Sequence, residues 1–249
     1  MLADATGLCE VILPETLTAI DDRAFENCTA LERLTLPSSL KKLTNTAFLG
    51  CTALKELYVL DLSVLLGMEL SIESYTGDIY PFHDRTVYCG GEALTSLVIP
   101  EGTTSIGRIL AGYTALTSVT LPASMTAVND KAFENCTALT SVTLAATTES
   151  IGAGAFAGCT ALTTVTLPAS LTSIGSDAFR DTALTAVYFE DAAYWSIPWA
   201  ISAYTYVFPT EQISDAAIAA SYLAKEYATS PWTKIDENTE ITLPPEMRG

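Results

Sequence analysis

The sequence predicts an α/β solenoid that ends in a C-terminal aromatic and helical cap. A 23-residue unit, clearest at residues 121–143, recurs along most of the 249-residue chain. A fixed period in the twenties is typical of a solenoid, because each coil can bury its apolar side only by stacking on its neighbours. The repeats stop after Leu184 and are followed by an aromatic-rich segment and by a pattern typical of a helix.

The copies can be placed in one register. Units of 23 residues run at 13–35, 36–58, 121–143 and 144–166, and units of 22 residues run at 99–120 and 167–188. In the central copy the apolar positions are Leu121, Met125, Val128, Phe133, Cys136, Leu139 and Val142. Their spacing is neither helical nor strictly alternating, so the whole coil is predicted to be the folding unit.

Two segments of each unit have a predictable local structure. The end of the unit, as in residues 139–144, is rich in β-branched residues and is followed in most copies by proline, which predicts a short strand. These strands are expected to stack as a parallel sheet along one face. The middle segment, Ile-Gly-x-x-Ala-Phe at residues 151–156 and 174–179, predicts a turn before a short helical or extended segment that inserts its phenylalanine.

The shared pattern L-P-x-S-[LM]-T-x-[IV]-x-x-x-A-F-x-x-C-T-x-L-T-x-V-T, across roughly residues 8–189, resembles the BspA-type leucine-rich repeat family. The resemblance implies a right-handed leucine-rich repeat with its parallel β-sheet on the concave face. It also implies a binding role in surface or secreted proteins of host-associated bacteria or of some protozoan parasites. Some members adhere to fibronectin, fibrinogen or other cells. The resemblance implies no catalytic residue.

We therefore expect a solenoid of about seven coils at residues 1–189, with an expanded irregular coil at 59–98, and a cap at 190–249. Ser214 or Asp215 is predicted to begin one helix near 213–228. The buried stripe of this helix is expected to comprise Ile213, Ala217, Ala220, Leu223, Ala224 and Tyr227. Residues 239–243 indicate one more short strand or a frayed tail.

The aromatic segment after the repeats allows two interpretations. Trp195 and Trp199 are predicted to cover the open apolar end of the last coil, which needs a large apolar lid. The alternative is a platform on which sugar rings stack. Substitution of both tryptophans by alanine distinguishes the two interpretations: loss of stability indicates a cap, and loss of glycan binding with intact folding indicates a platform.

Charge and hydropathy exclude several classes of partner. The chain has 29 acidic and 12 basic residues and a formal net charge of -17, which disfavours nucleic acid and anionic membranes. No apolar run reaches the roughly 20 residues that a membrane-spanning helix needs, and the first residues lack the pattern of a signal peptide. The chain begins partway through a repeat, so we expect a mature or trimmed part of an extracellular or cell-surface protein, with its export signal elsewhere.

Most of the cysteines follow the repeat. Cys28, Cys51, Cys136 and Cys159 share one position, at which Tyr113 stands in a fifth copy. This position predicts small buried hydrophobic side chains. Adjacent coils are separated by about 4.8 Å, a spacing that also permits a disulfide, so the sequence leaves the oxidation state open. Cys9 and Cys89 lie outside the repeat position and are interpreted as free thiols.

Catalytic signatures are missing from the sequence. The one histidine, His83, has no serine or cysteine motif nearby, no glycine loop is followed by a phosphate-binding lysine, and cysteines 23 residues apart do not form a zinc motif. We predict a protein that is not an enzyme and that uses no cofactor. A glycosidase acting through an acidic pair such as Glu190 and Asp191 is the catalytic alternative.

Two groups of residues are candidates for binding. The first consists of hydroxyl residues expected to point outward from the concave sheet: Thr117, Ser118, Thr120, Thr140, Ser141, Thr143, Thr163, Thr164 and Thr166. The second, Tyr80, Phe82 and His83, lies in the expanded coil, since insertions in solenoids often form specialised contact loops. The alternative is an insertion without a binding role that packs its own aromatic side chains. The predicted function is recognition of host or neighbouring-cell macromolecules, either protein or glycan. The alternatives are a glycan-binding module of a larger secreted protein and a structural spacer, and the oligomeric state stays open.

Overall fold

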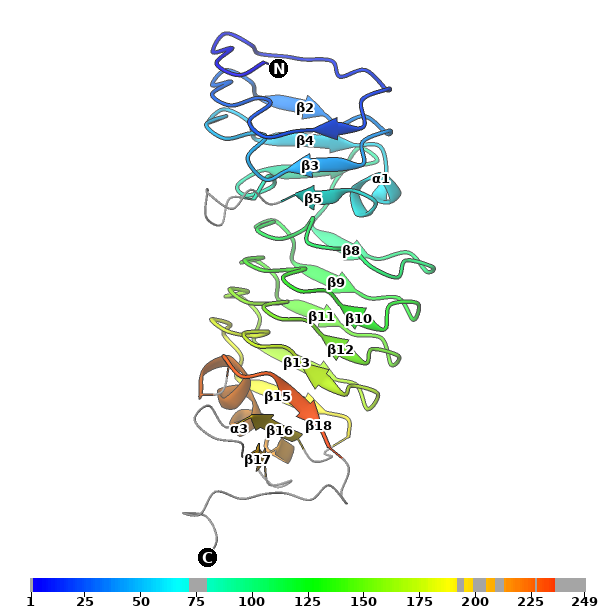
Figure 1. Cartoon of the computed structure of the whole chain (residues 1–249), viewed down its shortest axis with the longest axis vertical. Coiled ribbons are helices and arrows are strands. Elements are labelled where there is room, and N and C mark those ends of the chain that lie inside the picture. Colours follow the sequence, from blue (N-terminus) through cyan, green and yellow to red (C-terminus); the bar gives the residue numbers. More distant parts are fainter. Residues whose placement is uncertain are drawn as a thin grey trace, which may run out of the picture.

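The computed structural model describes residues 2–71, 80–191, 195–198, 205–208, 213–226 and 228–235. Its coils stack into an elongated solenoid with β2 (Arg33–Thr35) near one end and β15 (Ala186–Phe189) and β17 (Thr205–Phe208) at the other (Figure 1). Most coils contribute one strand to each of two faces and close through a turn that carries a buried phenylalanine, whereas the coil at residues 99–120 contributes one strand and has the buried Leu110 at that position. The predicted solenoid is therefore confirmed, because the repeat pattern directly encodes which side chains of each coil face its neighbours.

The unit ends form the strands of one face, which we call the tail-strand face. Its strands are β2 (Arg33–Thr35), β4 (Glu56–Val59), β6 (Thr86–Cys89), β8 (Ser96–Val98), β9 (Ser118–Thr120), β11 (Ser141–Thr143), β13 (Thr164–Leu167) and β15 (Ala186–Phe189). Neighbouring strands pair in parallel in the expected register, for example Leu34 with Leu57 and Leu57 with Val87. The paired residues Leu34, Leu57 and Val87 are buried, while the residues on either side of each in its strand point outward.

A second set of shorter strands runs along another face. These strands are β1 (Ala19–Ile20), β3 (Lys42–Thr44), β5 (Glu69–Ser71), β10 (Ala127–Val128), β12 (Ser150–Ile151) and β14 (Ser173–Ile174). They also pair in parallel, with Val128 opposite Ile151 and Ile151 opposite Ile174. The segment predicted as a turn followed by a helical or extended piece thus begins with a short strand.

The turn segments hold the core together between coils. The rings of Phe133 and Phe156 stack with centroids 5.4 Å apart, and Phe156 stacks at the same distance on Phe179. Beside this ladder, the thiol of Cys159 donates a hydrogen bond to the Phe133 carbonyl and that of Cys136 donates to Leu110. The cysteine position is therefore a buried thiol that satisfies a backbone acceptor of the preceding coil.

The residue before the repeat cysteine has a left-handed backbone. Its φ is 58° at Asn27, 75° at Gly50, 60° at Asn135 and 73° at Gly158. Glycine and asparagine tolerate this conformation best, which explains their alternation at this position.

The expanded coil is more ordered than a single insertion loop. It contains helix α1 (Leu62–Leu66), then β5 and β6, which extend both parallel sheets, and β7 (Glu92–Ala93), which pairs antiparallel with β6. Gly90 and Gly91, both at positive φ, form the reversal between β6 and β7. This hairpin ends the first tail-strand sheet, and β8 begins the next one.

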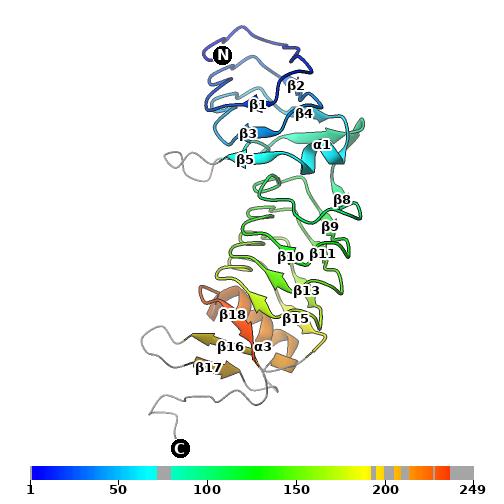
Figure 2. The same cartoon turned by 45° about the vertical axis from the view of Figure 1, so that its right-hand side comes forward.

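Two buried tyrosines join the expanded coil to the coils that follow. The Tyr80 hydroxyl donates to the Glu134 carboxylate over 2.5 Å, although the two residues lie 54 positions apart. Tyr113 fills the cysteine position, where its hydroxyl donates to the Leu94 carbonyl and accepts from the Val87 amide. Both views show β8 following β5 and β6 along the stack (Figure 2), so these contacts tie the two tail-strand sheets together.

The tail-strand face is interrupted a second time, between β11 and β13. β11 ends the sheet that contains β8 and β9, whereas β13 pairs only with β15 among the described strands. The coil that connects them departs from the repeat, with Ala145 in place of proline and Thr148 in place of the leucine or methionine of other copies. Thr148 is fully buried, and its hydroxyl has no hydrogen-bond partner among the described residues.

This orphaned hydroxyl leads to a stability prediction. Thr148→Val keeps the side-chain volume and removes a polar group that lost its water on folding, so we expect the free energy of unfolding to rise by about 1 kcal/mol. Chemical denaturation measures the change. The neighbouring Thr147→Val is the matched control, since the Thr147 hydroxyl donates to the Ala123 carbonyl over 2.8 Å. The control should be destabilising, and two changes of the same sign would contradict the assignment.

The cap covers the last coil with antiparallel strands and a short helix. β18 (Trp232–Lys234) pairs with β14 and with β16 (Trp195–Pro198), which in turn pairs with β17 (Thr205–Phe208). Helix α3 (Ala216–Ser221) packs on β15 and continues into a π-helical turn at Tyr222–Glu226. These elements lie around and below β15 at one end of the solenoid in both views (Figures 1 and 2), so the predicted aromatic and helical cap is confirmed.

Details of the cap differ from the expectation. Asp215 caps the start of α3 by accepting from the Ala217 and Ile218 amides, and Ala217 is exposed while Ala219 is buried. The predicted stripe was wrong at Ala217 because the helix is short and its regular turns give way to a wider π-helical turn. Ile213, Ala220, Leu223 and Ala224 are buried as predicted. Trp199, Tyr227 and residues 239–243 lie outside the described residues.

Candidate functional site

The predicted hydroxyl residues lie where the repeat register places them. Ser118 and Thr120 are on β9, Ser141 and Thr143 on β11, and Thr164 and Thr166 on β13. Thr117, Thr140 and Thr163 immediately precede these strands. All nine side chains are exposed or partly exposed. They form two sets rather than one continuous flat surface, because β11 and β13 belong to different sheets.

Some of these hydroxyls are used within the solenoid. The Thr117 hydroxyl donates to the Thr95 carbonyl, that of Thr140 donates to Thr117, and Ser118 shares a 2.7 Å hydrogen bond with Ser96. No side-chain partner is present in the described part of the chain for the hydroxyls of Thr120, Ser141, Thr143, Thr163, Thr164 and Thr166. These six hydroxyls are therefore available to a ligand.

The interruption between β11 and β13 adds a hollow with both polar and apolar walls to this surface. It has a volume of about 270 Å³ and is lined by Val142, Thr143, Leu144, Ala146, Thr166, Pro168 and Glu190. Val142 and Leu144 are core positions of the repeat, yet here both are only partly buried. The hollow thus combines apolar side chains with the hydroxyls of Thr143 and Thr166, which a protein or glycan partner could contact together.

A tyrosine pair on the same face was missed by the sequence reasoning. Tyr58 on β4 lies opposite Tyr88 on β6, and their rings stack at a centroid distance of 4.7 Å with an interplanar angle of 12°. On its other side Tyr58 faces the smaller Thr35, next to a hollow of about 440 Å³ that Glu15 and the exposed Leu60 also line. The repeat alignment could have predicted this pair, since both tyrosines occupy the outward position that threonine fills in other coils.

The three candidate residues in the expanded coil differ in burial. Tyr80 is 3% exposed and Phe82 is fully buried, so the prediction that they contact a partner was wrong. Tyr80 bonds Glu134 and Phe82 packs edge-on against Tyr113, both of which stabilise the junction between sheets. His83 is exposed, and its Nδ1 lies 3.3 Å from a carboxylate oxygen of Asp84.

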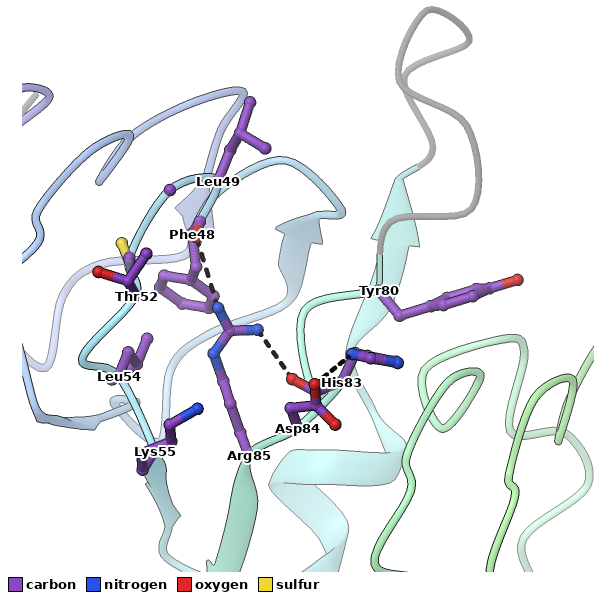
Figure 3. A pocket seen from close by; sticks show the side chains of 11 residues that line it. Phe48, Leu49, Thr52, Leu54, Lys55, Tyr80, His83, Asp84 and Arg85 are labelled. Atoms are coloured by element: carbon purple, nitrogen blue, oxygen red, sulfur yellow. Dashed lines mark hydrogen bonds and ion pairs between the residues drawn. The ribbon is translucent and has the colours of Figure 1, made fainter.

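His83 lines a hollow of about 450 Å³ on the turns before β4 and β6 (Figure 3). Arg85 reaches into it, with its guanidinium 5.8 Å from the centre of the Phe48 ring. The guanidinium donates to the carbonyls of Pro81, His83 and Phe48. Burial lowers the pKa of Arg85, since the charged form loses solvation there.

The described residues contain no group of three or more side chains that could hold a metal ion. All six cysteines are free thiols. Trp195 is 1% exposed, so its ring cannot serve as a sugar platform. Among the described residues, the candidate binding surfaces are thus the tail-strand face, with its free hydroxyls, and the hollow at Arg85, with its partly buried guanidinium.

The buried thiols predict a loss of stability in alkali. Burial raises the pKa of Cys159 from 9.0 to about 12 and that of Cys136 well above 9.0. A raised pKa means that the stabilisation is complete below about pH 9, where the unfolded thiol is still protonated, and is lost as the pH rises toward 12. Denaturant midpoints measured from pH 8 to pH 11 should fall, and Cys159→Ala should fall less steeply than the parent. Parallel slopes would contradict the prediction.

The comparisons with known proteins agree with the geometry. A family model described as the BspA type leucine rich repeat region, in six copies, matches residues 2–64 and 84–196. The chain belongs to the BspA-type leucine-rich repeat family. The family model leaves residues 65–83 unmatched within the expanded coil of this BspA-type protein, a stretch that contains β5, and it also leaves residues 197–249 unmatched. No curated protein matches the chain.

Several solved structures are similar to this BspA-type chain. A leucine-rich repeat protein from Bacteroides ovatus is 24% identical, with a TM-score of 0.41, and the match covers 72% of this chain and 54% of that one. A leucine rich cell surface protein from Faecalibacterium prausnitzii is 22% identical over 82% of this chain and 50% of that one, with a TM-score of 0.40. The pneumococcal vaccine antigen PcpA is 20% identical over 75% and 40%, with a TM-score of 0.34. The chain thus spans about half the length of these structures or less.

Family membership supports a binding role, because BspA-type leucine-rich repeats are generally modules for protein interaction and not enzymes. No helix in the described part of this BspA-type chain is long and apolar enough to span a membrane.

Proposed function

We propose that the protein is a non-enzymatic binding or adhesion protein, at the cell surface or secreted, that recognises host or neighbouring-cell macromolecules through its tail-strand face. Membership of the BspA-type family supports a binding role, and the face supplies a surface that suits it. The fold alone would not support this function, because one fold serves many functions.

The observation that carries the proposal is the chemistry at β11 and β13. Two repeat core positions, Val142 and Leu144, are partly exposed beside the free hydroxyls of Thr143 and Thr166. Specific interfaces combine an apolar centre with a polar rim in this way. Exposed apolar side chains have a solvation cost that a bound partner would remove.

A binding panel tests the proposal. The chain would be applied to immobilised fibronectin, fibrinogen and collagen and to a glycan array at about 150 mM salt, where attraction between exposed charges is screened beyond about 8 Å. We expect saturable binding to at least one protein. No binding at high micromolar concentrations would contradict adhesion and favour the spacer alternative.

A glycan is the second candidate partner, and its support comes from Tyr58. Sugar rings stack on exposed aromatic faces and bond nearby carboxylates and hydroxyls. The hollow beside Tyr58 is lined by Thr35 and by Glu15, one carboxylate oxygen of which already accepts from the Ser38 hydroxyl and amide, so the Thr35 hydroxyl and the other Glu15 oxygen are the groups for such contacts. If only glycans bind, Tyr58→Ala should abolish the binding, whereas binding that survives this change would exclude the site.

A further inference from the structure

We propose that the hollow lined by Phe48, Lys55, His83 and Arg85 binds a carboxylate that is attached to an apolar group. The hollow lies on the turns before β4 and β6 and not on the outward positions of the tail strands. It is therefore a second site, independent of the proposed macromolecular binding surface.

Arg85 makes no direct ion pair within the part of the chain that the structure describes, although the nearby Asp84 carboxylate favours its charged form. The three hydrogen bonds of Arg85 all go to backbone carbonyls. Its Nε is buried without a hydrogen-bond partner. The other partly buried arginine, Arg108, lies 3.5 Å from the Glu134 carboxylate. A partly buried guanidinium without a direct ion pair favours an external anion.

Two residues next to Arg85, Lys55 and Asp84, also affect which ligand charge the hollow favours. Lys55 lines the hollow and makes no ion pair with the described residues, so a second positive charge is available at the rim. The one acidic residue of the lining, Asp84, lies 3.3 Å from His83 Nδ1, and its carboxylate also favours the charged form of the neighbouring Arg85. Figure 3 shows the Lys55 amine and the guanidinium of Arg85 on the same side of the hollow. An anion between them would interact with both groups.

The apolar residues and the volume of the hollow indicate what group is attached to the carboxylate. Leu49 supplies partly exposed apolar surface beside the charged groups, with the buried side chains of Phe48 and Leu54 behind it. A volume of about 450 Å³ is the size of a site for a small ligand or for one large amino-acid residue. The ligand class is therefore an organic carboxylate with an aromatic or aliphatic body, present either as a free acid or as the end of a polypeptide.

Titration calorimetry with 3-phenylpropanoate and its uncharged amide tests the proposal. We expect the acid to bind about tenfold more tightly than the amide, because only the acid pairs with Arg85 and Lys55. A peptide ending in phenylalanine, with a free or an amidated C-terminus, distinguishes the two sources. Tighter binding of the free-ended peptide than of the small acid assigns a polypeptide, and the reverse assigns a free acid. Equal binding of acid and amide, or none by about 10 mM, would overturn the proposal.

Variants locate the site. Arg85→Gln should abolish the preference for the acid, and circular dichroism would show whether this variant folds. Lys55 is exposed, and Lys55→Glu leaves the hydrogen bonds of Arg85 to backbone carbonyls in place. This variant therefore tests the proposal even if Arg85→Gln unfolds. We expect Lys55→Glu to weaken acid binding about tenfold. Lys41→Glu has the same charge change outside the hollow and should leave binding unaltered. Equal effects of the two lysine variants, or none from Lys55→Glu, would place the carboxylate elsewhere.

Discussion

Phe156→Ala is expected to lower the free energy of unfolding by about 3–5 kcal/mol, the usual cost of truncating a fully buried aromatic residue. Phe156 stacks on a phenylalanine on both sides, Phe133 and Phe179, so the cavity opens between three coils. Chemical denaturation with Ser141→Ala as control measures the effect, since Ser141 is exposed and its loss should cost under about 0.5 kcal/mol.

The position of the damage is also predicted. Each coil of a solenoid contacts mainly its neighbours, so amide hydrogen exchange in Phe156→Ala should accelerate near β10 to β14 and little at β2 and β4. Uniform acceleration along the chain would contradict a locally propagated effect and would indicate that the whole solenoid unfolds as one unit.

Glu134→Ala is expected to have the second-largest effect, a loss of about 2–3 kcal/mol. The buried carboxylate accepts a hydrogen bond from Tyr80 and lies 3.0 Å from the Lys131 amine and 3.5 Å from Arg108. Its removal leaves the Tyr80 hydroxyl and two cations without this acceptor, across the junction between two sheets. Denaturation of Glu134→Ala against Glu149→Ala, which removes an exposed carboxylate, measures the difference. Equal stability of the two variants would show that the junction does not depend on Glu134.

The repeat made much of the fold predictable. The apolar positions Leu34, Val119 and Phe133 are buried because identical coils must place identical side chains against one another. The same logic placed Thr143 and Thr164 outward. The repeat register also predicts that Tyr58 and Tyr88 point outward, because they align with the outward-facing threonines of other coils.

What could not be predicted depends on contacts outside the repeat. Tyr80 is buried by Glu134, and no local pattern links residues 54 positions apart. The separation of β11 from β13 depends on how the coil with Thr148 packs, which periodicity does not describe. The hollow at Arg85 forms from two coils of different length, so its residues share no spacing in the sequence.

The most direct test of the account is whether the tail-strand face binds the partner found by the panel. A Thr143→Arg and Thr166→Arg double variant places two bulky charges at the hollow between β11 and β13, while Thr126→Arg adds one next to β10, outside the tail-strand face. Surface-immobilised titration should show binding weakened by about tenfold or more in the double variant and unaltered in the control, with both proteins folded. Unaltered binding by the double variant, or equal loss in the control, would contradict the assignment of this face.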